Sequence, residues 1–159
     1  INAWNILISS DALWTHDWTV KADPDAVFFP DRLRNHLWKH TKKEKMYYTL
    51  NCDYQGQPTL YGALEVFSKK ALYNYEANKA KCDALDWRGK WGEDMYMHMC
   101  MITIGVSPLV DYNLVGDNRC MQAPCTDKWR AAFHDFKDPG SWWNCYCQSE
   151  SCSQGQPMR

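Results

Sequence analysis

Eight cysteines among 159 residues constrain the fold of this chain more than any other feature. An even number at this density is typical of a disulfide framework, and disulfides persist in oxidising compartments. Structural zinc sites prefer repeated C-x2-C pairs, which this sequence lacks, so zinc binding and free thiols are the alternatives. We therefore expect a cross-linked domain in the secretory pathway lumen, in the Golgi or ER, or in another oxidising compartment.

The composition indicates a folded domain and excludes three classes of protein. With 18 basic and 19 acidic residues, the chain lacks the basic stripe of a nucleic-acid-binding module. Aromatic residues make up 14% of the chain, which excludes a disordered, solvated segment. The longest apolar stretch, residues 95–110, is interrupted by His98, Thr103 and Ser107, so we expect no membrane-spanning helix.

The order of local patterns predicts an α/β fold. Trp18–Ala22 is an apolar, β-branched run that predicts a short strand. Asp23-Pro24-Asp25 should end this strand, because proline cannot donate a hydrogen bond to a sheet, and should leave both carboxylates at its carboxyl end. The segment Thr59–Phe67 predicts a second strand.

Two helices are expected beside these strands. Ser68 can cap a helix that runs to about Ala84. Glu93 and Asp94 open another helix that runs to about Ile104, and acidic residues in a first turn suit the helix dipole. That second helix is apolar almost all round, which predicts burial on most sides.

The chain is expected to become less regular toward its end. From Val115 on, Gly, Pro and Cys are frequent, which predicts an irregular, cross-linked region with one short strand near Ala131–Phe133. We therefore divide the chain into a main domain, residues 1–135, and a Cys-rich tail, residues 136–159.

The two acidic pairs are the candidates for chemistry. Two carboxylates flanking one residue, Asp23 and Asp25, can hold a hard divalent cation such as Mn²⁺ or Mg²⁺ that bridges a diphosphate. A carboxylate on the exposed first turn of a buried helix, as at Glu93 and Asp94, is rigidly held and can act as a general base. Taken singly, the first pair also fits a solvated turn and the second fits plain helix stabilisation.

Three segments, taken in order, resemble a known family. They are WTVKADPD (residues 18–25), YGALEVFSKKAL (61–72) and GEDMYMHMCMITIGV (92–106). In this order they are similar to the carboxyl-terminal half of a GT-A glycosyltransferase of the β-1,3-glycosyltransferase superfamily, which includes the Fringe and core-1 galactosyltransferases. The resemblance covers about residues 1–135. It implies part of a GT-A, Rossmann-like mixed sheet flanked by helices, followed by the Cys-rich tail.

The resemblance implies a metal site with Mn²⁺ or Mg²⁺ as cofactor. Asp25 would coordinate the cation, and Asp23 would contact the nucleotide-sugar donor, or the cation through water. His134 resembles the late histidine that completes the metal shell in many such enzymes.

The resemblance also implies roles for residues that contact the sugars. Asp94, paired with Glu93, would be the catalytic base that deprotonates the hydroxyl of a glycan or protein acceptor. Gly62 would let the backbone approach the donor sugar or acceptor closely, and Trp91 could stack on an acceptor sugar ring. The implied reaction is an inverting displacement at the anomeric carbon. We therefore expect Asp25 and Asp94 to face one cleft, with His134 near Asp25.

Two departures from the family pattern favour a second hypothesis. Pro24 stands where the family usually carries another acid, and only 22 residues precede Asp23, whereas the family's nucleobase-binding strands come earlier in the chain. The alternative is a catalytically inactive glycosyltransferase-like domain, a pseudoenzyme that acts as a structural subunit among other proteins. A secreted carbohydrate-binding module would explain the nine tryptophans but neither acidic pair.

Overall fold

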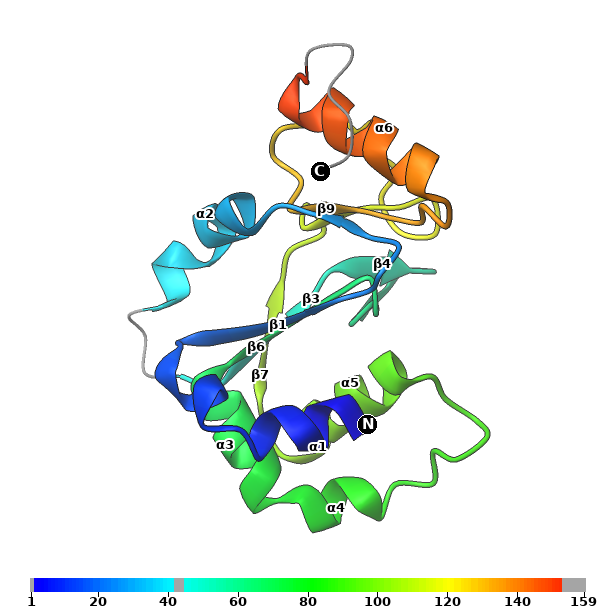
Figure 1. Cartoon of the computed structure of the whole chain (residues 1–159). Coiled ribbons are helices and arrows are strands. Elements are labelled where there is room, and N and C mark those ends of the chain that lie inside the picture. The colour runs from blue at the N-terminus through cyan, green and yellow to red at the C-terminus, as the bar shows by residue number, and fades with distance from the viewer. Residues whose placement is uncertain (1, 42–44, 153–159) are drawn as a thin grey trace.

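The computed structural model describes residues 2–41 and 45–152, which form a mixed α/β fold (Figure 1). The helices are α1 (Asn2–Ile8), the 3-10 helix η1 (Asp11–Thr15), α2 (Pro30–Thr41), α3 (Lys69–Ala77), α4 (Lys79–Asp83), α5 (Glu93–Thr103) and α6 (Pro139–Glu150). The strands are β1 (Trp18–Ala22), β2 (Val27–Phe28), β3 (Tyr47–Leu50), β4 (Cys52–Tyr54), β5 (Gln57–Thr59), β6 (Leu64–Ser68), β7 (Ser107–Val110), β8 (Val115–Gly116) and β9 (Ala132–Phe133). This arrangement confirms the predicted fold class, a mixed sheet flanked by helices.

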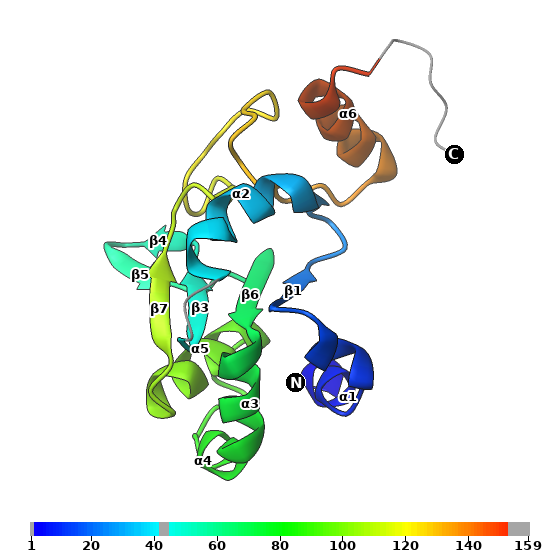
Figure 2. The same cartoon turned by 90° about the vertical axis from the view of Figure 1, so that its left-hand side faces the viewer.

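A four-stranded sheet with the order β1-β6-β3-β7 forms the centre of the fold. Strand β6 is antiparallel to both neighbours, whereas β3 and β7 are parallel. Helices α1, α3, α4 and α5 lie on one side of the sheet and α2 lies on the other, with α6 beyond it (Figures 1 and 2). Side chains of β6 alternate between the two sides: Leu64 and Val66 pack toward α2, and Phe67 packs against Trp4 and Leu72.

Several sequence predictions are confirmed, and one helix differs. Strand β1 ends at Ala22 as expected, and the Ser68 hydroxyl caps α3 by accepting from the Ala71 amide. The helix expected from Ser68 to about Ala84 is two helices, because it is interrupted at Asn78. The Asn78 side chain donates to the carbonyl of Asn74, and such local bonds compete with a continuous helix.

The tail was expected to be irregular, and the structure corrects this for residues 139–150. They form α6, which begins with Pro139 in its first turn and with Asp138 as its cap, accepting a hydrogen bond from the Ser141 amide. These start signals outweigh the Gly and Cys content that suggested a loop. Helix α6 packs near a smaller sheet with the order β2-β9-β8, and Trp142 contacts its core. Residues 153–159 of the predicted tail lie outside the described residues.

All eight cysteines are paired, which confirms the disulfide framework. The pairs are Cys52–Cys120, Cys82–Cys100, Cys125–Cys145 and Cys147–Cys152. These cysteines are therefore neither zinc ligands nor free thiols. Four disulfides are consistent with an oxidising compartment. The first pair closes a loop of 68 residues, and a loop of that length is worth about 4 kcal/mol in the chain-entropy model.

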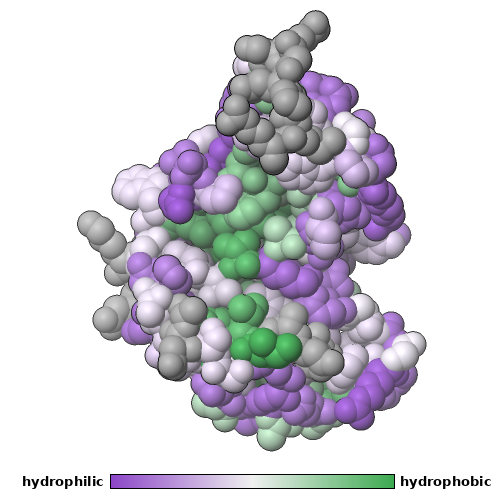
Figure 3. All heavy atoms as spheres, in the orientation of Figure 1, coloured by the Kyte–Doolittle hydropathy of each residue, from purple (hydrophilic) through white to green (hydrophobic). Residues whose placement is uncertain are grey.

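One face of the molecule exposes apolar surface beside the sheet edge. Strand β1 is one of the two edge strands of the four-stranded sheet. A groove of about 460 Å³ lies between it and α2, lined in part by Val20, Phe28 and Leu33. Figure 3 shows hydrophobic surface gathered in the middle of this face. Within the described residues, no helix is long and apolar enough to cross a membrane.

A buried histidine fastens α2 to the end of β7. The His36 side chain is 3% exposed, and its Nδ1 and Nε2 lie 2.6 Å from an Asp111 carboxylate oxygen and 2.8 Å from the Trp129 carbonyl. Both partners only accept hydrogen bonds, so both ring nitrogens donate. Burial alone would lower the pKa of His36, but the bonds to Asp111 and Trp129 raise it above its usual value.

We predict that His36→Ala lowers the free energy of unfolding by about 2 kcal/mol at mildly acidic pH. A histidine whose pKa is raised in the folded state contributes its full stabilisation at pH values below the ordinary histidine pKa of 6.5. This stabilisation is lost as the pH rises through the folded-state pKa. The melting temperature of the wild type should therefore fall as the pH rises through that range. The melting temperature of His36→Ala should lack this contribution and fall less. His16 is exposed, so His16→Ala is the control. If the melting temperature of His36→Ala fell with pH as steeply as that of the wild type, the assignment would be contradicted.

Candidate functional site

Strand pairing brings His134 beside the acidic turn that follows β1. Strands β2 and β9 are antiparallel, with Val27 opposite Phe133. The residue after β9 and the turn before β2 therefore lie at the same end of this pair. As a result, His134 Nε2 lies 3.2 Å from an Asp25 carboxylate oxygen, although more than 100 residues separate them in sequence.

The turn itself presents two carboxylates. The Ala26 amide donates to the Asp23 carbonyl at 3.0 Å, which closes a turn with Pro24 at its second position, where a fixed φ is favourable. Ligand atoms of Asp23, Asp25 and His134 all lie within 4.8 Å of one another, and all three residues are half-buried. Two carboxylates and an imidazole are a donor set that suits Mn²⁺, and the oxygens alone suit Mg²⁺. The structure thus brings together the predicted metal ligands.

Asp94 lies next to this cluster, across the backbone of Gly62. The Gly62 amide donates to one Asp94 carboxylate oxygen at 3.2 Å, and the Met95 amide donates to the other at 2.8 Å. A Cβ atom at position 62 would lie 3.3 Å from Asp94 Oδ2 and 3.6 Å from Asp23 Oδ2. Glycine therefore keeps the space between the two carboxylates open. A carboxylate has about four acceptor positions, so Asp94 retains capacity for a hydroxyl.

Glu93 belongs to a different group of charges, centred on Lys21. The Lys21 ammonium lies 3.0 Å from Glu93, 2.6 Å from the fully buried Glu65 and 3.2 Å from Asp23. The indole N–H of Trp4 also donates to Glu93. These contacts tie the start of α5 to β1 and give Glu93 a structural role, while its predicted part in catalysis stays a prediction.

The pKa values in this group follow from burial and from shared charges. Burial, and then the charge of Glu93, raises the pKa of Glu65 to about 8. Burial would also raise the pKa of Glu93, but hydrogen bonds from Glu65 and Lys21 bring it below its usual value. Burial would lower the pKa of Lys21, yet the two glutamates raise it. Glu65 and Glu93 therefore share the positive charge of Lys21.

Trp91 and Asp117 complete the comparison with the sequence predictions. Trp91 is half-buried in the turn before α5, where its amide donates to the Trp87 carbonyl, and its stacking role stays a prediction. Asp117 was not identified from the sequence, although its carboxylate lies 2.7 Å from His134 Nδ1. Its one local signal is that it directly follows the apolar pair of β8, as Asp23 follows β1.

Comparison of the sequence with models of protein families and with curated proteins finds no match. Function must therefore be inferred from the geometry of the site. That geometry offers three ligands for a divalent cation and, beside them, a carboxylate that can accept a proton.

We predict that Lys21→Met lowers the free energy of unfolding by about 3 kcal/mol, because it leaves buried carboxylates without a counter-charge. Adding Glu65→Gln to this variant should restore part of the loss, since the amide carries no charge. Chemical denaturation measures both effects, and the exposed Lys81→Met is the matched control. A loss below about 1 kcal/mol in Lys21→Met, typical of a surface ion pair, would show that this group does not hold the fold together.

Proposed function

We propose that this chain forms the cation-binding and acceptor-activating part of a glycosyltransferase, which transfers a sugar from a nucleotide-sugar to an acceptor hydroxyl with inversion. The observation that carries the proposal is the convergence of Asp23, Asp25 and His134 within 4.8 Å, from segments far apart in the chain. The position of Asp94 beside Asp23 supports it, because a transferase needs a base next to the donor. The family resemblance of residues 18–25, 61–72 and 92–106 agrees with these roles.

The donor set fits the cation that such a reaction needs. Asp25 and His134 would hold Mn²⁺ (or Mg²⁺), and Asp23 would contact it directly or through water. The Asp23 and Asp25 side chains are 34% and 25% exposed and leave room for ligands from a substrate, whereas the His134 side chain is 8% exposed. When bound, the cation would neutralise the charge that develops on the diphosphate leaving group.

The remaining steps belong to the residues around Gly62. The acceptor oxygen forms a bond to the anomeric carbon while the bond from that carbon to the diphosphate oxygen breaks, and the electron pair leaves with the nucleoside diphosphate. The acceptor proton passes to Asp94, whose two backbone hydrogen bonds hold it in place. The missing side chain at Gly62 gives the sugar access to the space between Asp94 and Asp23.

A second candidate function has its own supporting observation. His134 lies between Asp25, at 3.2 Å, and Asp117, at 2.7 Å, so a protonated imidazole would satisfy both carboxylates without a cation. This ion-paired arrangement suits an inactive domain that serves as a structural subunit among other proteins. The two functions differ in whether the protein binds Mn²⁺ and turns over a donor.

We predict Mn²⁺-dependent release of UDP from a panel of UDP-sugars, with water as acceptor, by a longer protein that contains this chain. Asp94→Asn should lower this rate about 10²- to 10⁴-fold, the usual contribution of a general base, and leave Mn²⁺ affinity unchanged. Asp86→Asn, an exposed aspartate paired with Lys90 on the surface, is the matched control. Full turnover in Asp94→Asn would refute the base assignment. Mn²⁺ binding or turnover absent from the wild-type protein would favour the structural subunit.

A further inference from the structure

We infer that Asp117 is a positioning residue that fixes the orientation and tautomer of His134, and that the Cys52–Cys120 disulfide holds the loop that carries Asp117. The inference rests on the proposed function only where it assigns His134 Nε2 to a cation. The geometry around His134 supports it independently.

The contact with Asp117 fixes where the imidazole proton lies. Asp117 Oδ2 is 2.7 Å from His134 Nδ1, and an ionised carboxylate only accepts hydrogen bonds. Nδ1 must therefore carry the hydrogen, and in the neutral ring Nε2 then carries a lone pair. That lone pair faces Asp25 Oδ1 at 3.2 Å, which is also an acceptor. Two acceptors at this distance call for a positive charge between them, either a proton on Nε2 or a cation as in the carboxylate–histidine–metal arrangement.

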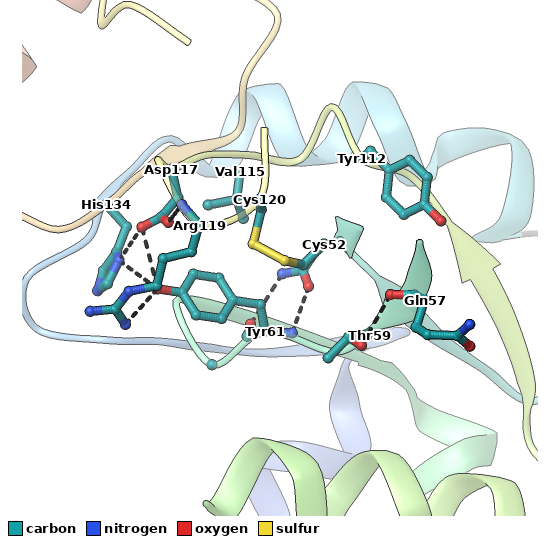
Figure 4. Close-up of a disulfide and its surroundings, with 12 residues drawn as sticks. Cys52, Gln57, Thr59, Tyr61, Tyr112, Val115, Asp117, Arg119, Cys120 and His134 are labelled. Atoms are coloured by element: carbon teal, nitrogen blue, oxygen red, sulfur yellow. Dashed lines mark hydrogen bonds and ion pairs between the residues drawn. A yellow bond between two sulfur atoms is a disulfide. The ribbon is translucent and has the colours of Figure 1, made fainter. Parts of the chain in front are cut away.

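Asp117 is itself held from several directions (Figure 4). Its side chain is 4% exposed. Oδ1 accepts from the Arg119 amide at 2.6 Å, and Oδ2 accepts from the Tyr61 hydroxyl at 3.3 Å. The Arg119 guanidinium donates to the same hydroxyl at 3.4 Å. A buried carboxylate that is hydrogen-bonded through both oxygens keeps one orientation. Its hydrogen bond with Nδ1 then fixes the orientation of the His134 ring.

The disulfide joins the two segments that carry this network. Cys120 belongs to the loop of Asp117, and its amide donates to the Asp117 carbonyl at 3.2 Å. Cys52 follows Asn51, whose side chain accepts from the Tyr61 amide at 2.7 Å and donates to the Tyr61 carbonyl at 3.2 Å. The disulfide therefore keeps the loop that carries Asp117 beside the segment that carries Tyr61, as Figure 4 shows.

Strand register explains why the loop needs such a bond. Strand β8 is parallel to β9, with Gly116 opposite Phe133, so Asp117 and His134 leave the sheet at the same end. Each strand contributes only two residues to this pairing. So short a ladder fixes the position of the following loop weakly, and the disulfide supplies the missing restraint.

The test is the ¹⁵N spectrum of the histidine rings in the protein without added metal, recorded over a series of pH values. Wild-type His134, identified by its loss in a His134 variant, should show hydrogen on Nδ1. Asp117→Asn should shift His134 toward hydrogen on Nε2, because the amide can donate to Nδ1. Tyr61→Phe removes one bond to Asp117 and also the 3.1 Å contact of the Tyr61 hydroxyl with His134 Nδ1, but it keeps the Asp117 carboxylate, so it should shift the tautomer less. The double variant Cys52→Ser/Cys120→Ser should behave like Asp117→Asn, whereas Cys147→Ser/Cys152→Ser, the matched control, should match the wild type.

Mn²⁺ affinity, measured by calorimetry on the same proteins, separates this inference from the proposed function. We expect a 10- to 100-fold loss in Asp117→Asn and in the Cys52 and Cys120 double variant, typical of losing a partner of a metal ligand. An unchanged tautomer in Asp117→Asn would overturn the positioning role. A wild-type tautomer in a folded double variant would overturn the role of the disulfide. A shifted tautomer in a protein that binds no Mn²⁺ would support the positioning and refute the metal site.

Discussion

The pairing of β2 with β9 is the contact on which the candidate site depends. It brings the turn after β1 and the residue after β9 to one place, and without it His134 would not reach Asp25. Because two residue pairs make a weak ladder, other contacts must support it. The Phe29 amide donates to the Ala131 carbonyl at 2.8 Å, the Phe136 amide donates to the Asp25 carbonyl at 2.9 Å, and a disulfide from Cys125 anchors α6 over the same core.

Burial divides the acidic residues between structure and chemistry. Glu65 points into the interior from β6, and Lys21, opposite it on β1, supplies the counter-charge that such a position needs. Asp25 lies at the rim of the smaller sheet with its side chain partly exposed, where a cation and a substrate could reach it, and the more deeply buried His134 lies behind it. Asp23 touches both groups, since its carboxylate contacts Lys21 and faces the cluster. The ion group at Lys21 therefore also fixes one wall of the candidate site.

Local sequence signals predicted the elements that depend on neighbours in the chain. Strand β1, which ends just before Asp23, and the Ser68 cap were predicted in this way. Helix α6 was not predicted, although its Asp138 cap and Pro139 are local signals too. The proximity of His134 came from the family resemblance and not from any pattern. The short strand expected near Ala131–Phe133 is β9. Nothing in the sequence shows that it pairs with β8, so the approach of Asp117 to His134 could not be predicted. Eight cysteines allow 105 pairings, so only the folded chain shows which loop the Cys52 disulfide holds.

The most direct test of the cation site is anomalous diffraction from crystals of this protein grown with Mn²⁺. We expect one strong anomalous peak in coordinating contact with Asp25 and with His134 Nε2, beside Asp23, while Nδ1 of His134 keeps its bond to Asp117. Mn²⁺ absent from this place, with the His134 ring in direct hydrogen-bonded contact with both Asp25 and Asp117, would contradict a metal-dependent enzyme and leave an ion-paired structural domain.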